Sequence, residues 1–272
     1  MNALYPQDSY DDLLATLRDL PQLESLHLGD DILPDFTDFD VHPRVPLLNL
    51  KSLTLSGTVG MIALFLRSVD ILPSCELELL CDDITGLEDV EDGEVDALVA
   101  SLQTLYSPAV EAAASFGQLL IVDKPDDYYV CLRISATEPS SPMQLPNCLC
   151  LDVMSQESPS AFTSQLLSTL PLIGGIKTLT LVHVTFLGPQ EWQRIGPAMT
   201  DVENLLLKCD AGMAQGICEA LYTALWGTPT VFPRLRNLVV MLRSDSRFVL
   251  TETQFVRMRQ GSPMTVIYRA WT

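Results

Sequence analysis

The sequence predicts an α/β solenoid in which parallel strands line the inside of an arc and helices cover its outside. A pattern of the form Leu-x-x-Leu-x-Leu occurs in five copies, and the first two copies are 27 residues apart. Stretches with helical periodicity lie between copies, which makes one strand and one helix per unit. A period of this length is typical of a leucine-rich repeat, so we expect an irregular leucine-rich-repeat horseshoe. The five copies are centred on Leu26, Leu53, Leu179, Leu205 and Leu238.

The strands are predicted from the alternation of apolar and polar residues within each copy, as in Leu53-Thr54-Leu55. Alternation with a period of two is typical of a strand that buries one face. Since a strand–helix unit cannot bury its own apolar side, we expect neighbouring units to stack with parallel strands. Weaker copies of the pattern predict further strands around Leu77, Leu132 and Leu149, and a closing strand over residues 265–271.

Helices are predicted where apolar residues recur every three or four positions. Several of these stretches end at a Leu-Pro pair, at Leu20, Leu72 and Leu170. Proline lacks a backbone N–H and disfavours helical geometry in the residue before it, so these pairs indicate helix ends. The predicted helical stretches are 13–20, 61–69, 95–105, 162–170 and 217–225.

We expect residues 1–272 to form a single domain with an irregular insertion near 107–130. The spacing from Leu77 to Leu132 is too long for one repeat, and that from Leu132 to Leu149 is too short to hold a helix. Residues 118–122 and 128–134 could pair as a hairpin, because Asp123-Lys124-Pro125-Asp126-Asp127 between them is favourable turn sequence.

The charge is strongly negative and unevenly distributed. The net charge is −19, and residues 1–150 hold 26 acidic and 6 basic side chains. Such a surface repels phosphate backbones, so we expect no nucleic-acid binding. It suits a basic partner protein, or it serves only to keep the protein soluble.

The seven cysteines are an odd number and include no C-x-x-C pair. A disulfide framework or a structural zinc site is therefore not expected. This cysteine usage indicates a reducing compartment, so we expect a cytoplasmic or nuclear location. Residues 1–10 have neither a basic flank nor an apolar run, so they do not resemble a signal peptide. No apolar stretch approaches the length of about 18 residues that spans a membrane.

No catalytic or cofactor-binding motif is recognisable, so the chain is expected not to be an enzyme and to use no cofactor or metal. The acidic run 82–96 fails as a calcium loop, because Val99 stands where the closing carboxylate should be. Its end is better explained by Glu94 and Asp96 in the first turn of a helix. His27, His42 and His183 have no neighbours at ligand spacing.

The polar residues between paired leucines predict a binding surface on the concave side. In order this stripe is His27, Thr54, Glu78, Arg133, Cys150, Thr180, Leu206 and Val239, polar at its start and apolar at its end. An exposed apolar patch often marks a protein interface, although a folded-back chain end could also cover it. Cys148 and Cys150 alternate with leucines and should share this side, with no neighbouring positive charge expected to lower their pKa. The candidate protein-binding residues are Arg133, Cys150, Thr180, Val182, Leu206, Lys208, Val239 and Met241.

Three phrases carry a resemblance to a known family: Leu20-Pro21-Gln22-Leu23-Glu24-Ser25-Leu26-His27-Leu28, Leu50-Lys51-Ser52-Leu53-Thr54-Leu55-Ser56-Gly57 and Phe232-Pro233-Arg234-Leu235-Arg236-Asn237-Leu238. They resemble the repeats of F-box proteins of mushroom-forming fungi. The resemblance covers roughly residues 10 to 242. It implies that the repeats hold the target of a cullin ubiquitin ligase, while an F-box before them binds the ligase adaptor. No F-box precedes the first repeat helix here, so adaptor binding is expected only if such a segment lies upstream.

The expected function is that of a non-enzymatic scaffold that binds a protein on its concave face, as the target-recognition part of an F-box-like ligase subunit. Two alternatives remain open at this point. One is an enzyme that uses carboxylates or cysteines of the concave face, and the other is a degenerate repeat protein without a partner.

Overall fold

The structure is a computed structural model of the 272-residue chain. It describes residues 10–29, 33, 43–81, 93–111, 116–124, 129–136, 149–154, 160–184, 187–210, 214, 232–243 and 265–271. The helix expected over 217–225, most of the acidic run, and His42, Cys148, Cys218 and Trp226 lie outside these residues.

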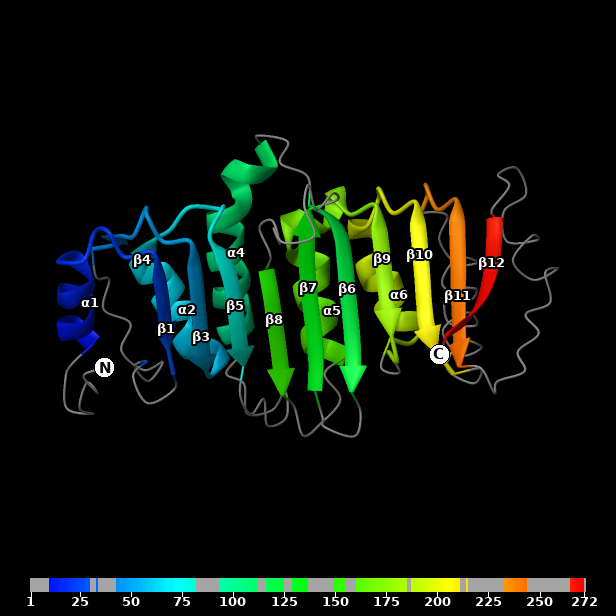
Figure 1. The fold of residues 1–272 in the computed structure, drawn as a ribbon, viewed down its shortest axis with the longest axis horizontal. Coiled ribbons are helices and arrows are strands. Elements are labelled where there is room, and N and C mark those ends of the chain that lie inside the picture. The colour runs from blue at the N-terminus through cyan, green and yellow to red at the C-terminus, as the bar shows by residue number, and fades with distance from the viewer. Residues whose placement is uncertain are drawn as a thin grey trace.

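The described part of the chain consists of short strands and helices (Figure 1). The helices are α1 (Tyr10–Arg18), α2 (Val59–Ser68), α4 (Glu94–Glu111), α5 (Ser160–Thr169) and α6 (Pro189–Ile195), with 3-10 turns η2 (Pro171–Gly175) and η3 (Gly196–Ala198). The strands are β1 (Ser25–Leu28), β2 (Val45–Pro46), β3 (Ser52–Gly57), β4 (Val69–Asp70), β5 (Glu76–Cys81), β6 (Phe116–Lys124), β7 (Tyr129–Ala136), β8 (Leu149–Met154), β9 (Thr178–Val182), β10 (Asn204–Cys209), β11 (Asn237–Arg243) and β12 (Thr265–Trp271).

Ten of these strands form one large, mostly parallel sheet in the order β1-β3-β5-β8-β7-β6-β9-β10-β11-β12. The repeat pattern sets its register, because the middle leucines of adjacent copies pair directly: Leu26 with Leu53, and Leu205 with both Leu179 and Leu238. The structure confirms the predicted α/β class, the strands at the five copies of the leucine pattern and the closing strand.

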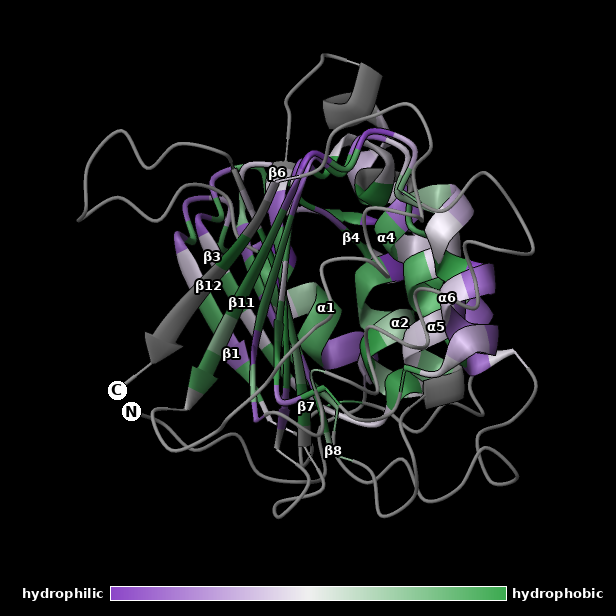
Figure 2. Cartoon of the chain, turned by 90° about the vertical axis from the view of Figure 1, so that its right-hand side faces the viewer, coloured by the Kyte–Doolittle hydropathy of each residue, from purple (hydrophilic) through white to green (hydrophobic). Residues whose placement is uncertain are grey.

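The sheet and the helices form two layers, with the described helices on one face of the sheet (Figure 2). Alternate strand residues point into this interface and are fully buried, as in β3, where Leu53 and Leu55 have no exposed surface. The apolar stripe of α2 meets them with Ile62 and Phe65, which are equally buried. Burying such a side chain contributes about 1.5–3 kcal/mol, so this layer interface supplies most of the hydrophobic stabilisation.

Polar contacts also join the helices to one another. Ser101 of α4 donates to the carbonyl of Ala63 in α2 at 3.3 Å. The Gln165 amide of α5 donates to the Asp96 carboxylate of α4 at 2.8 Å. These bonds link α4 to its neighbours α2 and α5.

The centre of the sheet departs from the expected all-parallel order. Strand β7, which carries the pattern around Leu132, is antiparallel to both of its neighbours, β6 and β8. The predicted hairpin of β6 and β7 does form, with Leu119 opposite Ile134. The chain passes from β5 through α4 to β6, three places along the sheet, and returns through β7 to β8 beside β5.

The segment near 107–130, expected to be an irregular insertion, is regular wherever it is described. Residues 107–111 are the last part of α4, and residues 116–124 form β6 in the middle of the sheet. The expectation failed because it assumed that strands stack in sequence order. A hairpin that enters the sheet between two repeat strands satisfies the same hydrogen bonds without following that order.

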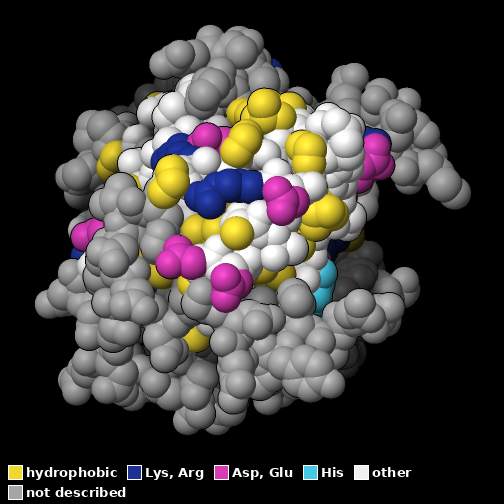
Figure 3. All heavy atoms as spheres, turned by 90° about the vertical axis from the view of Figure 1, so that its left-hand side faces the viewer, with side chains coloured by type: hydrophobic (Ala, Val, Ile, Leu, Met, Phe, Trp, Pro, Cys, Tyr) yellow, Lys and Arg dark blue, Asp and Glu magenta, His cyan; other side chains and the backbone are white. Residues whose placement is uncertain are grey.

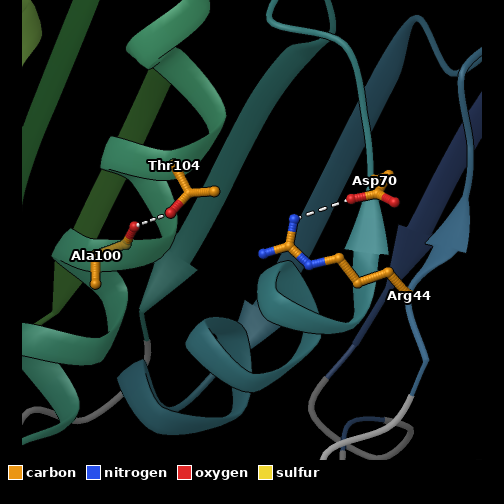
Figure 4. A network of polar contacts seen from close by, with 4 residues as sticks. All are labelled: Arg44, Asp70, Ala100 and Thr104. Atoms are coloured by element: carbon orange, nitrogen blue, oxygen red, sulfur yellow. Dashed lines mark hydrogen bonds and ion pairs between the residues drawn. The ribbon is translucent and has the colours of Figure 1, made fainter.

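The N-terminal end of the sheet carries charged side chains of both signs among apolar ones (Figure 3). Here Lys51 pairs with Glu24 at 2.7 Å. The two-residue strands β2 and β4 pair nearby, and Arg44 reaches Asp70 at 2.9 Å (Figure 4). Both partners are almost half exposed, so this pair contributes at most about 1 kcal/mol.

Helix starts follow the expected chemistry. The Thr58 side chain accepts a hydrogen bond from the Met61 N–H and caps α2. Glu94 and Asp96 stand in the first turn of α4, as predicted, where the helix dipole favours negative charge. Later in α4, Thr104 donates to the carbonyl of Ala100 (Figure 4).

Within the described residues, no helix is both long and apolar enough to cross a membrane.

The position of β6 gives a stability prediction. Leu119 is 1 % exposed, so Leu119→Ala should lower the free energy of unfolding by about 2–5 kcal/mol. Leu48→Ala is the matched control, because Leu48 is 53 % exposed and its truncation should cost less than about 0.5 kcal/mol. Urea denaturation measures both. Equal costs for the two variants would mean that β6 is not a central strand.

Candidate site on the open face of the sheet

The face of the sheet opposite the helices, called the open face below, carries the predicted binding stripe. The strand register aligns its residues in one continuous row from β1 to β11, with Leu120 of β6 as an additional member. The row reads His27, Thr54, Glu78, Cys150, Arg133, Leu120, Thr180, Leu206 and Val239.

The predicted order of this row needs one correction. Cys150 lies beside Glu78, and Arg133 follows it, because β8 sits between β5 and β7. The predicted order had Arg133 first, as in the sequence. The exchange places Arg133 directly opposite Cys150 on antiparallel strands.

A second row runs beside the first at the carboxyl ends of β9–β11. It contains Val182, Lys208 and Met241, paired strand to strand, and Val122 of β6 extends it. Together, the two rows on β6 and β9–β11 contain eight residues, which we call the apolar patch: Leu120, Val122, Thr180, Val182, Leu206, Lys208, Val239 and Met241. All eight side chains are only partly buried, in contrast to the fully buried leucines that alternate with them.

Leu120 and Val122 are patch residues that the sequence reasoning missed. Their strand was treated as part of an insertion, and a neighbour was predicted only on its hairpin side. A signal was present, because Leu119-Leu120-Ile121-Val122 is an unbroken apolar run. Such a run is typical of a central strand with both faces covered or partly covered, and not of a surface loop.

A ladder of side-chain amides lies at the amino ends of the same strands. The Asn237 amide donates to the Asn204 side-chain oxygen at 2.7 Å, and the Asn204 amide donates to the Thr178 hydroxyl at 3.4 Å. The ladder runs along the same face as the patch, two residues away from it. It ties β9, β10 and β11 together and so helps to hold the patch in one rigid surface.

The second feature of the open face is a cluster of two thiols, one carboxylate and one guanidinium on β7 and β8. The sulfurs of Cys131 and Cys150 are 3.9 Å apart, and the Cys150 sulfur is 3.5 Å from Asp152 Oδ1. Arg133 Nη2 lies 3.9 Å from the Cys150 sulfur. Both cysteines are 7 % exposed, whereas Asp152 is partly and Arg133 largely exposed.

The two thiols differ in acidity. The pKa of Cys150 is lowered, first because Cys131 donates a hydrogen bond to its thiolate, and further because Arg133 is close. The pKa of Cys131 is raised, first because its proton is held in that same hydrogen bond and then because it is buried. When the pair loses its first proton, this hydrogen bond therefore favours Cys150 as the thiolate, with Cys131 still protonated.

This arrangement overturns the expectation that no positive charge lies near these cysteines. Arg133 and Cys150 are 17 residues apart in the sequence, and the antiparallel pairing of β7 with β8 brings them together. Cys148, the other cysteine expected on this face, lies outside the described residues.

The other described cysteines are structural. Burial raises the pKa of Cys75 to about 12 and that of Cys209 to about 11. Trp192 is fully buried and packs edge-to-face against Phe232, with ring centroids 5.6 Å apart. His27 lies exposed at the polar end of the open-face row.

No known protein-family model matches the chain, and neither curated proteins nor solved structures gave a match. The site must therefore be interpreted from its own geometry.

The cluster gives a prediction about thiol acidity. Arg133→Gln removes a cation beside the Cys150 thiolate, so the pKa of Cys150 should rise. Alkylation of Cys150 by iodoacetamide, followed by mass spectrometry across a pH series, should shift toward higher pH in the variant. Arg236→Gln, an exposed arginine at the start of β11, is the control and should leave the profile unchanged. An unchanged profile in Arg133→Gln would mean that this guanidinium does not influence the thiol.

Proposed function

We propose that this protein is a non-enzymatic interaction scaffold that binds a protein partner through the apolar patch on the open face of its sheet. The observation that supports this most directly is the convergence of Thr180, Val182, Leu206, Lys208, Val239 and Met241 in two adjacent rows. These six side chains are partly exposed on three paired strands. Four of them are apolar, although a soluble protein has no structural need for apolar residues there.

The chemistry of the patch favours a particular kind of partner surface. Its members are mainly branched aliphatic residues and Met241, so the facing surface should be apolar at its centre. Lys208 lies among them and is partly buried, so an acidic group opposite it would be favoured. The net charge of −19 opposes a nucleic-acid partner.

The repeat arrangement and the resemblance to fungal F-box proteins extend this proposal. In that interpretation the sheet is the inner side of a leucine-rich-repeat solenoid in the cytoplasm or nucleus. The patch would then hold the target protein of a ubiquitin ligase. The support is the direct pairing of the repeat leucines, which is what stacked repeat units require.

The test begins with identification of the partner. A photo-crosslinking amino acid at Val239, in the centre of the patch, should capture a protein from an extract of the source cells. The same group at Leu72, which is 43 % exposed and outside the patch, should not capture it. Equal capture at both positions, or no capture at Val239, would count against the proposal.

With the partner purified, substitutions in the patch should weaken its binding. Leu206→Asp and Val239→Asp each place a charge in the centre of the apolar surface, and each should lower the affinity at least ~30-fold, as for an interface hot spot of about 2 kcal/mol. Leu72→Asp is the matched control and should bind like the unmodified protein. Circular dichroism checks that all three variants fold. Unchanged affinity in both patch variants would show that the partner binds elsewhere.

A further inference from the structure

The cluster of Cys131, Cys150 and Asp152 is the feature of the open face that the scaffold proposal leaves unexplained. It lies directly beside the apolar patch, because Cys131 of β7 pairs with Val122 of β6. Its three potential ligand atoms all lie within 4.8 Å of one another. From this geometry we infer a binding site for a thiophilic divalent cation of the zinc type.

The distances between the ligand atoms agree with tetrahedral coordination. A tetrahedral Zn²⁺ with Zn–S bonds of about 2.3 Å holds two thiolate sulfurs about 3.8 Å apart. The sulfurs of Cys131 and Cys150 are 3.9 Å apart. With a Zn–O bond of about 2.1 Å, a thiolate and a carboxylate oxygen lie about 3.6 Å apart. The Cys150 sulfur and Asp152 Oδ1 are 3.5 Å apart.

The same distances make a disulfide the weaker explanation. Cys131 and Cys150 are not directly opposite each other; Cys131 pairs with Asp152 and Cys150 pairs with Arg133. They are therefore diagonal neighbours, whose Cα atoms in an ideal antiparallel pair are about 7–8 Å apart. A disulfide needs Cα atoms within about 7 Å and sulfurs about 2.0 Å apart. A bridging cation would leave the two sulfurs close to their present separation.

The donor set selects the cation. Two thiolates favour soft or borderline ions such as Zn²⁺ over Ca²⁺ and Mg²⁺, which prefer oxygen ligands. Binding displaces one proton from each thiol to solvent, so the bound site contains two thiolates and a carboxylate. The charge of the cation and of the Arg133 guanidinium, which lies 3.9 Å from the Cys150 sulfur, then balances those three negative charges. Three protein ligands leave the fourth corner of the tetrahedron for water or for a group of a bound partner.

The local fold holds the ligands in place. Cys150 and Asp152 are alternate residues of β8 and so project from the same face, and Cys131 approaches from the adjacent β7. On the opposite face of these strands Leu132, Leu151 and Val153 are buried in the core. Sites built on such rigid strands need little reorganisation to bind an ion.

The experiment uses the full chain, reduced, with its thiols counted and its metal removed. Titration with Zn²⁺ against a chromophoric chelator should show one ion bound per chain, and Co²⁺ should give the visible spectrum and the sulfur-to-metal charge-transfer band of a tetrahedral thiolate site. X-ray absorption of the zinc form should show two sulfur ligands at about 2.3 Å. An absence of zinc binding, or a zinc ion with oxygen ligands only, would overturn the inference.

Variants separate this site from binding to the acidic surface. Cys150→Ser and Cys131→Ser should each lower zinc affinity at least ~100-fold, since they remove a direct ligand, and Asp152→Asn should lower it about 10-fold or more. Cys209→Ser and Asp210→Asn are the matched controls on β10 and should bind zinc normally. Undiminished binding in Cys150→Ser and Cys131→Ser would overturn the site.

Should a cysteine variant fail to fold, Asp152→Asn and the spectrum of the unmodified protein still decide the question. A further measurement is the thermal midpoint, which Zn²⁺ should raise in the unmodified protein but not in Asp152→Asn at the same ion concentration. Neither readout requires a partner, so this inference can fail while the proposed scaffold function stands, and the reverse also holds.

Discussion

Alternate side chains of the large sheet are buried against one layer of helices, and this burial determines the register of the described strands. A shift of one residue in any strand would turn its leucines away from the helices. Each side chain exposed in this way would lose about 1.5–3 kcal/mol of hydrophobic stabilisation. The leucine pairs of β3, β5, β9 and β10, all less than 2 % exposed, show how fully the constraint is met. The Leu-x-Leu spacing is therefore a structural requirement in these four strands.

The same constraint leaves the other face of the sheet free to vary. Because side chains alternate strictly, the residue between two buried leucines must project from the open face. Its identity hardly affects the core, so polar, charged and apolar residues all occur there, from Glu78 on β5 to Leu206 on β10. A charged substitution on the open face should therefore be tolerated by the fold, which makes the patch residues suitable for tests of binding.

How far the sequence could predict this structure depends on which contacts are local. Thr180, Leu206 and Val239 were placed correctly because each lies in a repeat and the repeats stack in order. Leu120 could not be placed in the row, because the predicted hairpin indicates only β7 as a neighbour of β6, and nothing local indicates β9 on the other side. Its neighbours are decided by the whole sheet, in which β9 needs a parallel partner and β5 pairs with β8. The cluster around Cys150 was missed for the same reason, since it depends on the pairing of β7 with β8.

The interruption of the repeat at β7 also explains why the candidate metal site lies there. Where parallel repeats stack in sequence order, strand neighbours on the open face come from consecutive repeats, 24 residues apart in the case of Thr54 and Glu78. A reversed strand brings Arg133 directly opposite Cys150, 17 positions away, and places Cys131 diagonally to Cys150, 19 positions away. That diagonal offset leaves the sulfurs of Cys131 and Cys150 too far apart for a bond but well spaced for a shared ion. The regular repeats thus provide an extended surface, while the irregular centre provides the one described cluster of thiol and carboxylate ligands.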